Sequence, residues 1–169
     1  VLIFSFLFFN FSFGEIVKKI DVSGNKRISK ETVLVLGNIS VGKNFDDTQL
    51  NDSLKKLYNS NFFKDIKMSI NDGVLNIKLI ENPIIENIEI TGIKSKSFTD
   101  DLLDNIILKD RMSFTEEQLK RDINLIKNIL KTNGFYFAKV ETSLIKDEEL
   151  NSVRLKFEVD RGKKARIQK

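Results

Sequence analysis

The chain repeats one order of sequence patterns in its two halves, and this repeat restricts the fold more than any other feature. Residues 16–25 and 84–92 each alternate apolar and polar residues and then stop at Ser-Gly or Thr-Gly, which predicts a strand closed by a turn. Each half continues with a short helical segment, a longer helical segment and two alternating segments. A repeated supersecondary unit predicts two similar units in tandem.

The short helical segment of each half has a candidate cap at its start. In the first half, Ser29 is expected to cap a helix over Glu31–Leu36, and Gly37 is expected to end it in a left-handed conformation. In the second half, Thr99 is expected to cap a helix over Asp100–Leu108. The repeat therefore predicts a short helix after the first strand of each unit.

The longer helical segment of each half begins with the same two features. A capping residue is followed three positions later by Gln, which is the spacing of a capping box. The Phe before the cap and a Leu in the first turns of the helix have the spacing of a hydrophobic staple. Apolar residues then recur at the i, i+4, i+7 spacing of a helix that lies on one surface. The residues concerned are Phe45, Asp46, Gln49 and Leu50 in the first half and Phe114, Thr115, Gln118 and Leu119 in the second.

Two alternating segments complete each half. In the first half, strands are predicted over Lys64–Ile70 and Leu75–Leu79, joined by a tight turn at Asp72-Gly73. In the second half, strands are predicted over Ala138–Ile145 and Val153–Val159. The predicted fold class is α+β, with two tandem β-α-α-β-β units, each a three-stranded mixed sheet covered by two helices.

The limits of the repeat give the expected domain organisation. Residues 15–82 form the first predicted domain and residues 83–163 the second, with the boundary at the single proline. Residues 1–14 contain an apolar run too short to cross a bilayer and end in a small-x-small pattern, so they are predicted to be a signal peptide. A buried core strand and an uncleaved membrane anchor are the alternatives for this run. Residues 164–169 are predicted to start a truncated third repeat.

The composition argues against an enzyme. The chain has no His and no Cys, which removes the commonest general base, the thiolate nucleophile and the usual ligands of zinc and iron–sulfur sites. Three pairs of carboxylates lie at predicted helix starts, where negative charge complements the helix dipole. We therefore predict no catalytic residue, no cofactor and no bound metal. The pairs are Asp46/Asp47, Asp100/Asp101 and Glu116/Glu117.

A nucleic-acid partner is not expected either. The net charge of +4 and a unit of two helices and three strands suggest comparison with the KH module that binds RNA. That module needs a G-x-x-G loop between its helices. The link over residues 37–43 has no glycine pair at that spacing, so basic residues are interpreted as solvated surface.

Five segments carry motifs of a known domain family. They are Ile20–Ile28, Leu57–Ile66 and Leu79–Pro83 in the first half, and Asn133–Val140 and Phe157–Gly162 in the second. Both halves resemble the POTRA (polypeptide-transport-associated) domain, and more specifically the arm of the BamA family. The likeness covers nearly all of residues 15–169. Two departures are Asn61, where glycine is usual, and the segment after Gly92, which lacks the usual Asn-x-Arg.

The resemblance implies a non-enzymatic function on the periplasmic side of the outer membrane, in a Gram-negative type of cell envelope. It implies a scaffold arm of an outer-membrane protein assembly factor, with unfolded outer-membrane proteins as clients and accessory lipoproteins as partners. It also implies a carboxy-terminal barrel that is absent from this chain. The arm of a two-partner secretion transporter and an inner-membrane division or anchoring protein are the alternatives.

The resemblance also indicates where clients would bind. A three-stranded sheet keeps exposed edges, and an extended client can add to such an edge as a further strand. In the sheet order of the family, the second strand of each unit is the available edge. The alternative is that these edges are only solvated or are covered by the neighbouring unit. The predicted client- and partner-binding residues are Lys64, Asp65, Ile66, Lys67, Met68, Ser69, Ala138, Lys139, Val140, Glu141, Thr142 and Ser143.

Overall fold

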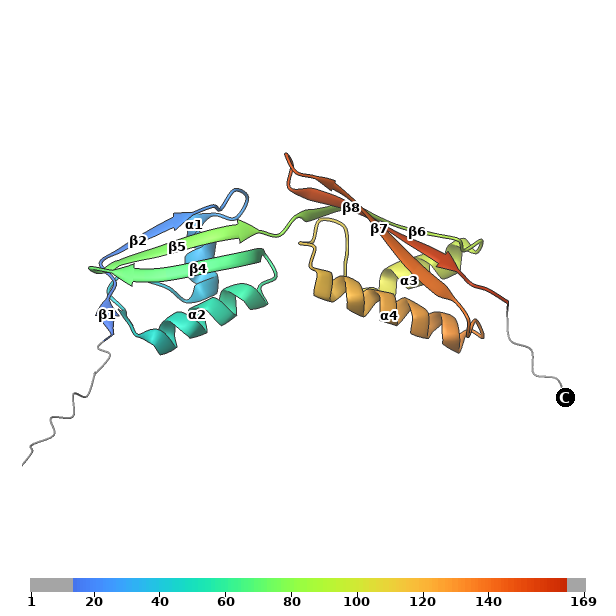
Figure 1. The fold of residues 1–169 in the computed structure, drawn as a ribbon, viewed down its shortest axis with the longest axis horizontal. Coiled ribbons are helices and arrows are strands. Elements are labelled where there is room, and N and C mark those ends of the chain that lie inside the picture. Colours follow the sequence, from blue (N-terminus) through green and yellow to red (C-terminus); the bar gives the residue numbers. More distant parts are fainter. Residues whose placement is uncertain (1–13, 164–169) are drawn as a thin grey trace, which may run out of the picture. The chain divides into compact units, whose positions relative to one another are not determined.

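The structure, a computed structural model, describes residues 14–163 and divides into two compact units, one ending at Glu81 and the other starting at Asn82. Each unit has its helices on one side of a three-stranded mixed sheet (Figure 1), so the predicted α+β fold class is confirmed. Residues 1–13 of the predicted signal peptide and the predicted third repeat at 164–169 lie outside the described residues. No helix in the described part is long and apolar enough to cross a bilayer.

The first unit has β5 (Val74–Glu81) in the middle of its sheet. β2 (Lys19–Ser23) pairs with β5 in parallel, and β4 (Phe63–Asn71) pairs with it antiparallel. The first predicted strand is interrupted, because β1 (Glu15–Ile16) leaves this sheet and pairs with β3 (Asn44–Phe45). The main sheet of this unit therefore has β2 and β4 as its two edges.

The first helix of this unit, α1 (Lys30–Gly37), is capped by Ser29 as predicted, since the Ser29 side chain accepts the Thr32 N–H. The prediction for its end was wrong. The left-handed residue is Asn38, with φ 53°, and Gly37 lies inside the last turn. A Cβ at Gly37 would come within 2.6 Å of Ile39 Cδ1, so this glycine provides room for packing.

The capping box at the second helix is complete only in the first unit. At α2 (Asp47–Asn59), Asp46 Oδ1 accepts the Gln49 N–H at 3.0 Å, and Gln49 Oε1 accepts the Asp46 N–H at 3.2 Å. At α4 (Glu116–Thr132), Thr115 accepts the Gln118 N–H at 3.3 Å, but the Gln118 side chain accepts from the Thr115 hydroxyl instead. The predicted cap is confirmed in both units, and the return bond only in the first.

The second unit repeats the topology of the first. β8 (Ser152–Asp160) is the central strand, β6 (Ile84–Thr91) pairs with it in parallel, and β7 (Lys139–Asp147) pairs with it antiparallel. The edges of this sheet are therefore β6 and β7. Each unit has its own core, with Leu57 and Leu75 fully buried in the first and Leu130 and Phe157 fully buried in the second.

The short helix of the second unit, α3 (Lys96–Asn105), begins one turn earlier than predicted. Its cap is Ser95, which accepts the Phe98 N–H, whereas Thr99 lies inside the helix and donates its hydroxyl to the Ser95 carbonyl. The earlier start places Phe98 in the first turn, where it packs against the core. The helix also ends before Leu108, which is buried in the core from the following loop.

One glycine after the first strand of each sheet marks an equivalent point in the two units. Gly24 and Gly92 have φ angles of 84° and 86°. A Cβ there would lie 2.0 Å from the carbonyl oxygen of Leu79 and 1.9 Å from that of Val159, respectively, so only glycine fits. When the units are aligned on these glycines, β2, β4 and β5 correspond to β6, β7 and β8.

Candidate functional site: the edges of the two sheets

The predicted binding residues lie almost entirely on two edge strands. Residues 64–69 are within β4, and residues 139–143 are within β7, whereas Ala138 precedes β7. Both strands pair on one side only with the central strand of their sheet. The structure also places β2 and β6 at edges, and these two strands were not among the binding edges predicted from the sequence.

A side chain from α2 occupies part of the β4 edge. The N–H of Ile66 donates to the Tyr58 hydroxyl oxygen at 3.1 Å, so the main-chain groups of Ile66 point away from β5. Along an antiparallel edge strand, residues whose main-chain groups bond to the neighbouring strand alternate with residues whose main-chain groups point outward. The main-chain groups of Met68 and Ile70 therefore also point outward. An added strand would therefore find one outward-facing donor of β4 already bonded.

The edge strands β2 and β6 also have side chains that bond to their main chain. On β2, Lys30 Nζ donates to the carbonyl of Ile20 at 2.6 Å. On β6, the Asp110 carboxylate accepts the N–H of Ile88 at 2.9 Å. The same strand is also covered by a loop, because Ile85 exchanges main-chain hydrogen bonds with residues 111 and 112. We call Lys30, Tyr58 and Asp110 the blocking side chains.

The β7 edge has no blocking side chain among residues 14–163. The residues of β7 that face the core are Val140, Thr142 and Leu144, and by the alignment they correspond to Ile66, Met68 and Ile70. Side-chain direction and hydrogen-bond direction alternate together along a strand, so their main-chain groups point outward. No side chain of the described residues bonds to these groups. After the buried leucine near the end of the long helix, Lys131 stands where the first unit has Tyr58.

Exposed apolar side chains lie at both ends of β7. Tyr136 and Phe137 precede the strand, and the side chain of Phe137 is 75% exposed. Ile145 near the other end is 58% exposed, and Leu150 in the following turn is also exposed. The equivalent position to Ile145 in β4 is Asn71. The open edge is therefore also the edge with apolar surface available at its ends.

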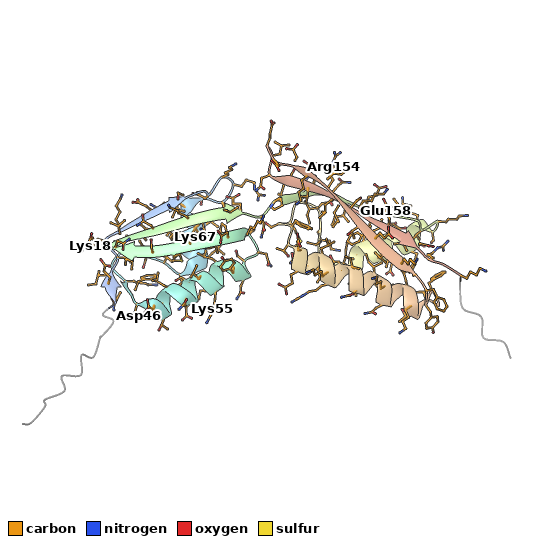
Figure 2. The ribbon with its side chains drawn as sticks, viewed as in Figure 1. Lys18, Asp46, Lys55, Lys67, Arg154 and Glu158 are labelled. Carbon is orange, nitrogen blue, oxygen red and sulfur yellow. The ribbon has the colours of Figure 1, made fainter. Side chains whose placement is uncertain are left out.

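The outer faces of the two sheets carry opposite charge at equivalent positions. Lys67 lies directly opposite Lys78 in the first sheet, and Glu141 lies directly opposite Glu158 in the second. Figure 2 labels Lys67 on the first sheet and Glu158 on the second. Lys156 Nζ lies 2.9 Å from Glu158 Oε1, and this hydrogen bond, with the attraction of the same carboxylate, raises the pKa of Lys156. Like charges opposite each other repel, so a charge of opposite sign would be favoured beside each of these two pairs.

Two buried carboxylates hold loops in place. Glu81 accepts the N–H groups of Lys26, Arg27 and Ile28 at 2.7 to 3.0 Å, and Arg27 Nε lies 3.2 Å from its other oxygen. Burial alone would raise the pKa of Glu81, but the three N–H groups and the Arg27 charge outweigh burial and lower the pKa. The role of Glu81 is therefore to accept hydrogen bonds from the main-chain N–H groups of the loop after β2.

In the second unit, Asp122 of α4 is fully buried and accepts the N–H groups of Ile107 at 2.6 Å and Leu108 at 2.9 Å. Both hydrogen bonds tie the loop between α3 and α4 to the long helix. Within residues 14–163, no three His, Cys, Asp or Glu side chains gather as metal ligands would. The buried acids thus have structural partners in the main chain.

Two α+β units in tandem, each with exposed strand edges, define a class of repeated β-α-α-β-β domains. The chain belongs to the POTRA family: the family model described as "Surface antigen variable number repeat" matches residues 15–82 and again residues 83–162. The resemblance noted from the sequence motifs is therefore confirmed.

Curated relatives are named as outer membrane protein assembly factors. The "Outer membrane protein assembly factor BamA" of Neorickettsia risticii is 28% identical over 144 residues, which cover 84% of this chain and 19% of the relative. The protein of the same name from Nitratidesulfovibrio vulgaris is 26% identical over 163 residues, covering 94% and 20%. The chain spans about a fifth of the length of these relatives.

Solved structures share the fold. The N-terminal domain of Omp85 from Thermosynechococcus elongatus has a TM-score of 0.58 and 14% identity, with coverage of 87% of this chain and 63% of that one. POTRA1-2 of the periplasmic domain of Omp85 from Anabaena has a TM-score of 0.52 and 15% identity, with coverage of 87% and 95%.

Proposed function

We propose that the chain is part of the periplasmic arm of an outer-membrane protein assembly factor and that it binds client polypeptides in extended form along β7. The POTRA family membership and the BamA relatives support the first part. The open β7 edge is the observation that carries the second part, because the other described edges each have a blocking side chain. In this proposal the domains have no catalytic role.

Binding would take place through the main chain. A client strand paired with Val140, Thr142 and Leu144 would form about six hydrogen bonds, each with a net value of about 1 kcal/mol before the cost of ordering the client. Such a complex is weak and reversible. Because main-chain groups do not depend on side-chain identity, many different clients could use the same edge.

The remaining parts of the function concern the whole protein. Unfolded outer-membrane proteins are the proposed clients, and accessory lipoproteins of the assembly complex are the proposed partners along the arm. The rest of such a protein would carry the membrane barrel. The BamA relatives support this assignment. Residues 64–69 of β4 stay a second proposed edge, with access limited by the Tyr58 hydroxyl.

The test uses proline at equivalent positions of the two edges. Thr142→Pro removes an outward-facing N–H from β7 without removing a bond to β8, which is the setting in which edge strands tolerate proline. Met68→Pro is the matched change in β4. The probe is a chemically unfolded outer-membrane barrel protein, cross-linked to the full chain through a photoreactive group at residue 139 for β7 and, in a separate chain, at the equivalent residue 65 for β4.

We expect Thr142→Pro to reduce cross-linking severalfold while the far-UV circular dichroism spectrum is retained. Met68→Pro is expected to change cross-linking little, because Tyr58 already bonds to the neighbouring donor of β4. Equal cross-linking by the wild-type chain and the Thr142→Pro variant would contradict binding at β7.

A further inference from the structure

We propose that the β7 edge selects extended segments with a basic side chain opposite Glu141 and a bulky apolar side chain four positions away, opposite Ile145. The inference rests on the proposed function and adds a side-chain preference to it. It follows from the outer face of β7, where the side chains of an added strand would lie beside those of the sheet.

The charge preference comes from Glu141. Its side chain is exposed at the edge, and its cross-strand neighbour is Glu158, a residue of the same sign. Lys156 forms an ion pair with Glu158, whereas no Lys or Arg of the described residues forms one with Glu141. A basic residue on an added strand would lie beside Glu141, on the side away from β8, and could form an ion pair with it.

The neighbouring charge on β7 does not compete for this role. Lys139 lies on the same face, two residues before Glu141, and its cross-strand neighbour is Asp160. Lys139 therefore faces a charge of opposite sign across the sheet, whereas Glu141 faces one of the same sign. Glu141 is the position where an added strand would meet an uncompensated charge of the edge.

The apolar preference comes from Ile145. Side chains on one face of a strand recur every two residues, so Glu141 and Ile145 share the outer face, about 13 Å apart at ~3.3 Å per residue. Ile145 is 58% exposed, and its cross-strand neighbour is Arg154. An apolar residue on the added strand would cover this side chain. An added strand has the same spacing, which fixes the separation of the two preferred residues at four.

The first unit would reject the same segment. Lys67 and Lys78 stand at the positions of Glu141 and Glu158, and Asn71 stands at the position of Ile145. A basic residue would face two lysines there, and an apolar one would face an amide. The two edges thus differ in preference as well as in access.

The test measures binding of two fluorescent ten-residue peptides to the full chain by anisotropy. Both alternate polar and apolar residues and carry Ile on the outer face, and they differ only in having Lys or Glu four residues after it, the order for antiparallel addition. We expect the Lys peptide to bind about two- to fivefold more tightly at low salt, with the difference decreasing as salt is added.

The matched variants are Glu141→Lys and Lys67→Glu. Glu141→Lys is expected to reverse the preference between the peptides, and Lys67→Glu to leave it unchanged. Ile145→Ser is expected to weaken the binding of both peptides to the same extent. Equal binding of the two peptides by the wild-type chain would overturn the selectivity and leave the edge function intact. Binding of neither peptide at millimolar concentration would count against the edge function itself.

Discussion

The two units have the same strand order and helix order, yet within the described residues only the second has an edge strand without a blocking side chain. In the first unit, Lys30 and Tyr58 bond to the main chain of β2 and β4. In the second unit, Asp110 bonds to β6, and β7 has no such contact within the described residues. The comparison shows that one side chain near a strand can change the availability of an edge without any change of fold.

The units also differ in which side chain accepts hydrogen bonds from the main-chain N–H groups of their loops. In the first unit a carboxylate from the end of β5, Glu81, binds the loop after β2. At the equivalent position of the second unit stands Arg161, whose guanidinium lies 5.3 Å from the centre of the Phe135 ring. There Asp122 binds a different loop. Buried N–H groups need acceptors in both units, but the element that supplies the acceptor can change.

The largest effect that would sharpen this comparison is expected from Asp122→Ala. The change leaves two N–H groups of the α3–α4 loop without an acceptor, and we expect the free energy of unfolding of the second unit to fall by about 4 kcal/mol. Hydrogen exchange followed by mass spectrometry would measure it, with peptides from residues 15–81 as the internal reference. Equal loss of protection in both units would contradict the independence of the two cores.

A smaller effect is expected from Glu81→Gln in the first unit. The variant keeps one acceptor oxygen and loses the charge, so we expect a loss of about 2 kcal/mol at pH 7. Since the pKa of Glu81 is lowered in the folded state, its stabilisation is present above the unfolded value of about 4.3 and is lost as the pH falls through the folded value. Urea unfolding at pH 7 and pH 3 should therefore show a smaller difference between variant and wild type at the lower pH. A constant difference would exclude the charge as the cause.

The smallest effect on stability, and the most direct test of the edges, is expected from Tyr58→Phe. Removal of the hydroxyl frees the Ile66 N–H and costs the first unit about 1 kcal/mol. We expect unfolded client to cross-link more strongly to β4 in this variant. Tyr136→Phe is the matched control, because Tyr136 is exposed and lies outside the helix–edge contact. If cross-linking of the client to β4 did not increase in Tyr58→Phe, then Tyr58 would not control access to the β4 edge.

Local features of the fold could be predicted because their causes are local. The caps at Ser29, Asp46 and Thr115 depend on a few neighbouring residues, and so does the Asp72-Gly73 turn, whose φ angles are 54° and 79°. The start of α3 could not be predicted in this way. Ser95 and Thr99 can both cap a helix, and the packing of Phe98 against the core decides between them.

The candidate site was predictable only in outline. The alternating segments and the family sheet order indicated β4 and β7, but the contacts of Lys30, Tyr58 and Asp110 depend on how helices and loops approach a strand in three dimensions. No spacing in the sequence encodes that approach. One signal was present, since Tyr58 and Lys131 follow corresponding buried leucines and differ in kind.

The acidic pair on the second sheet has a consequence for the behaviour of the chain in concentrated solution. A bare strand border can join to the same border of another copy, and this is the usual beginning of aggregation in sheet proteins. Two copies that met through β7 about a twofold axis near residue 141 would bring Glu141 of each molecule together, beside Glu158. Repulsion between the two Glu141 side chains would disfavour this register of self-association, which leaves the border more accessible to foreign chains.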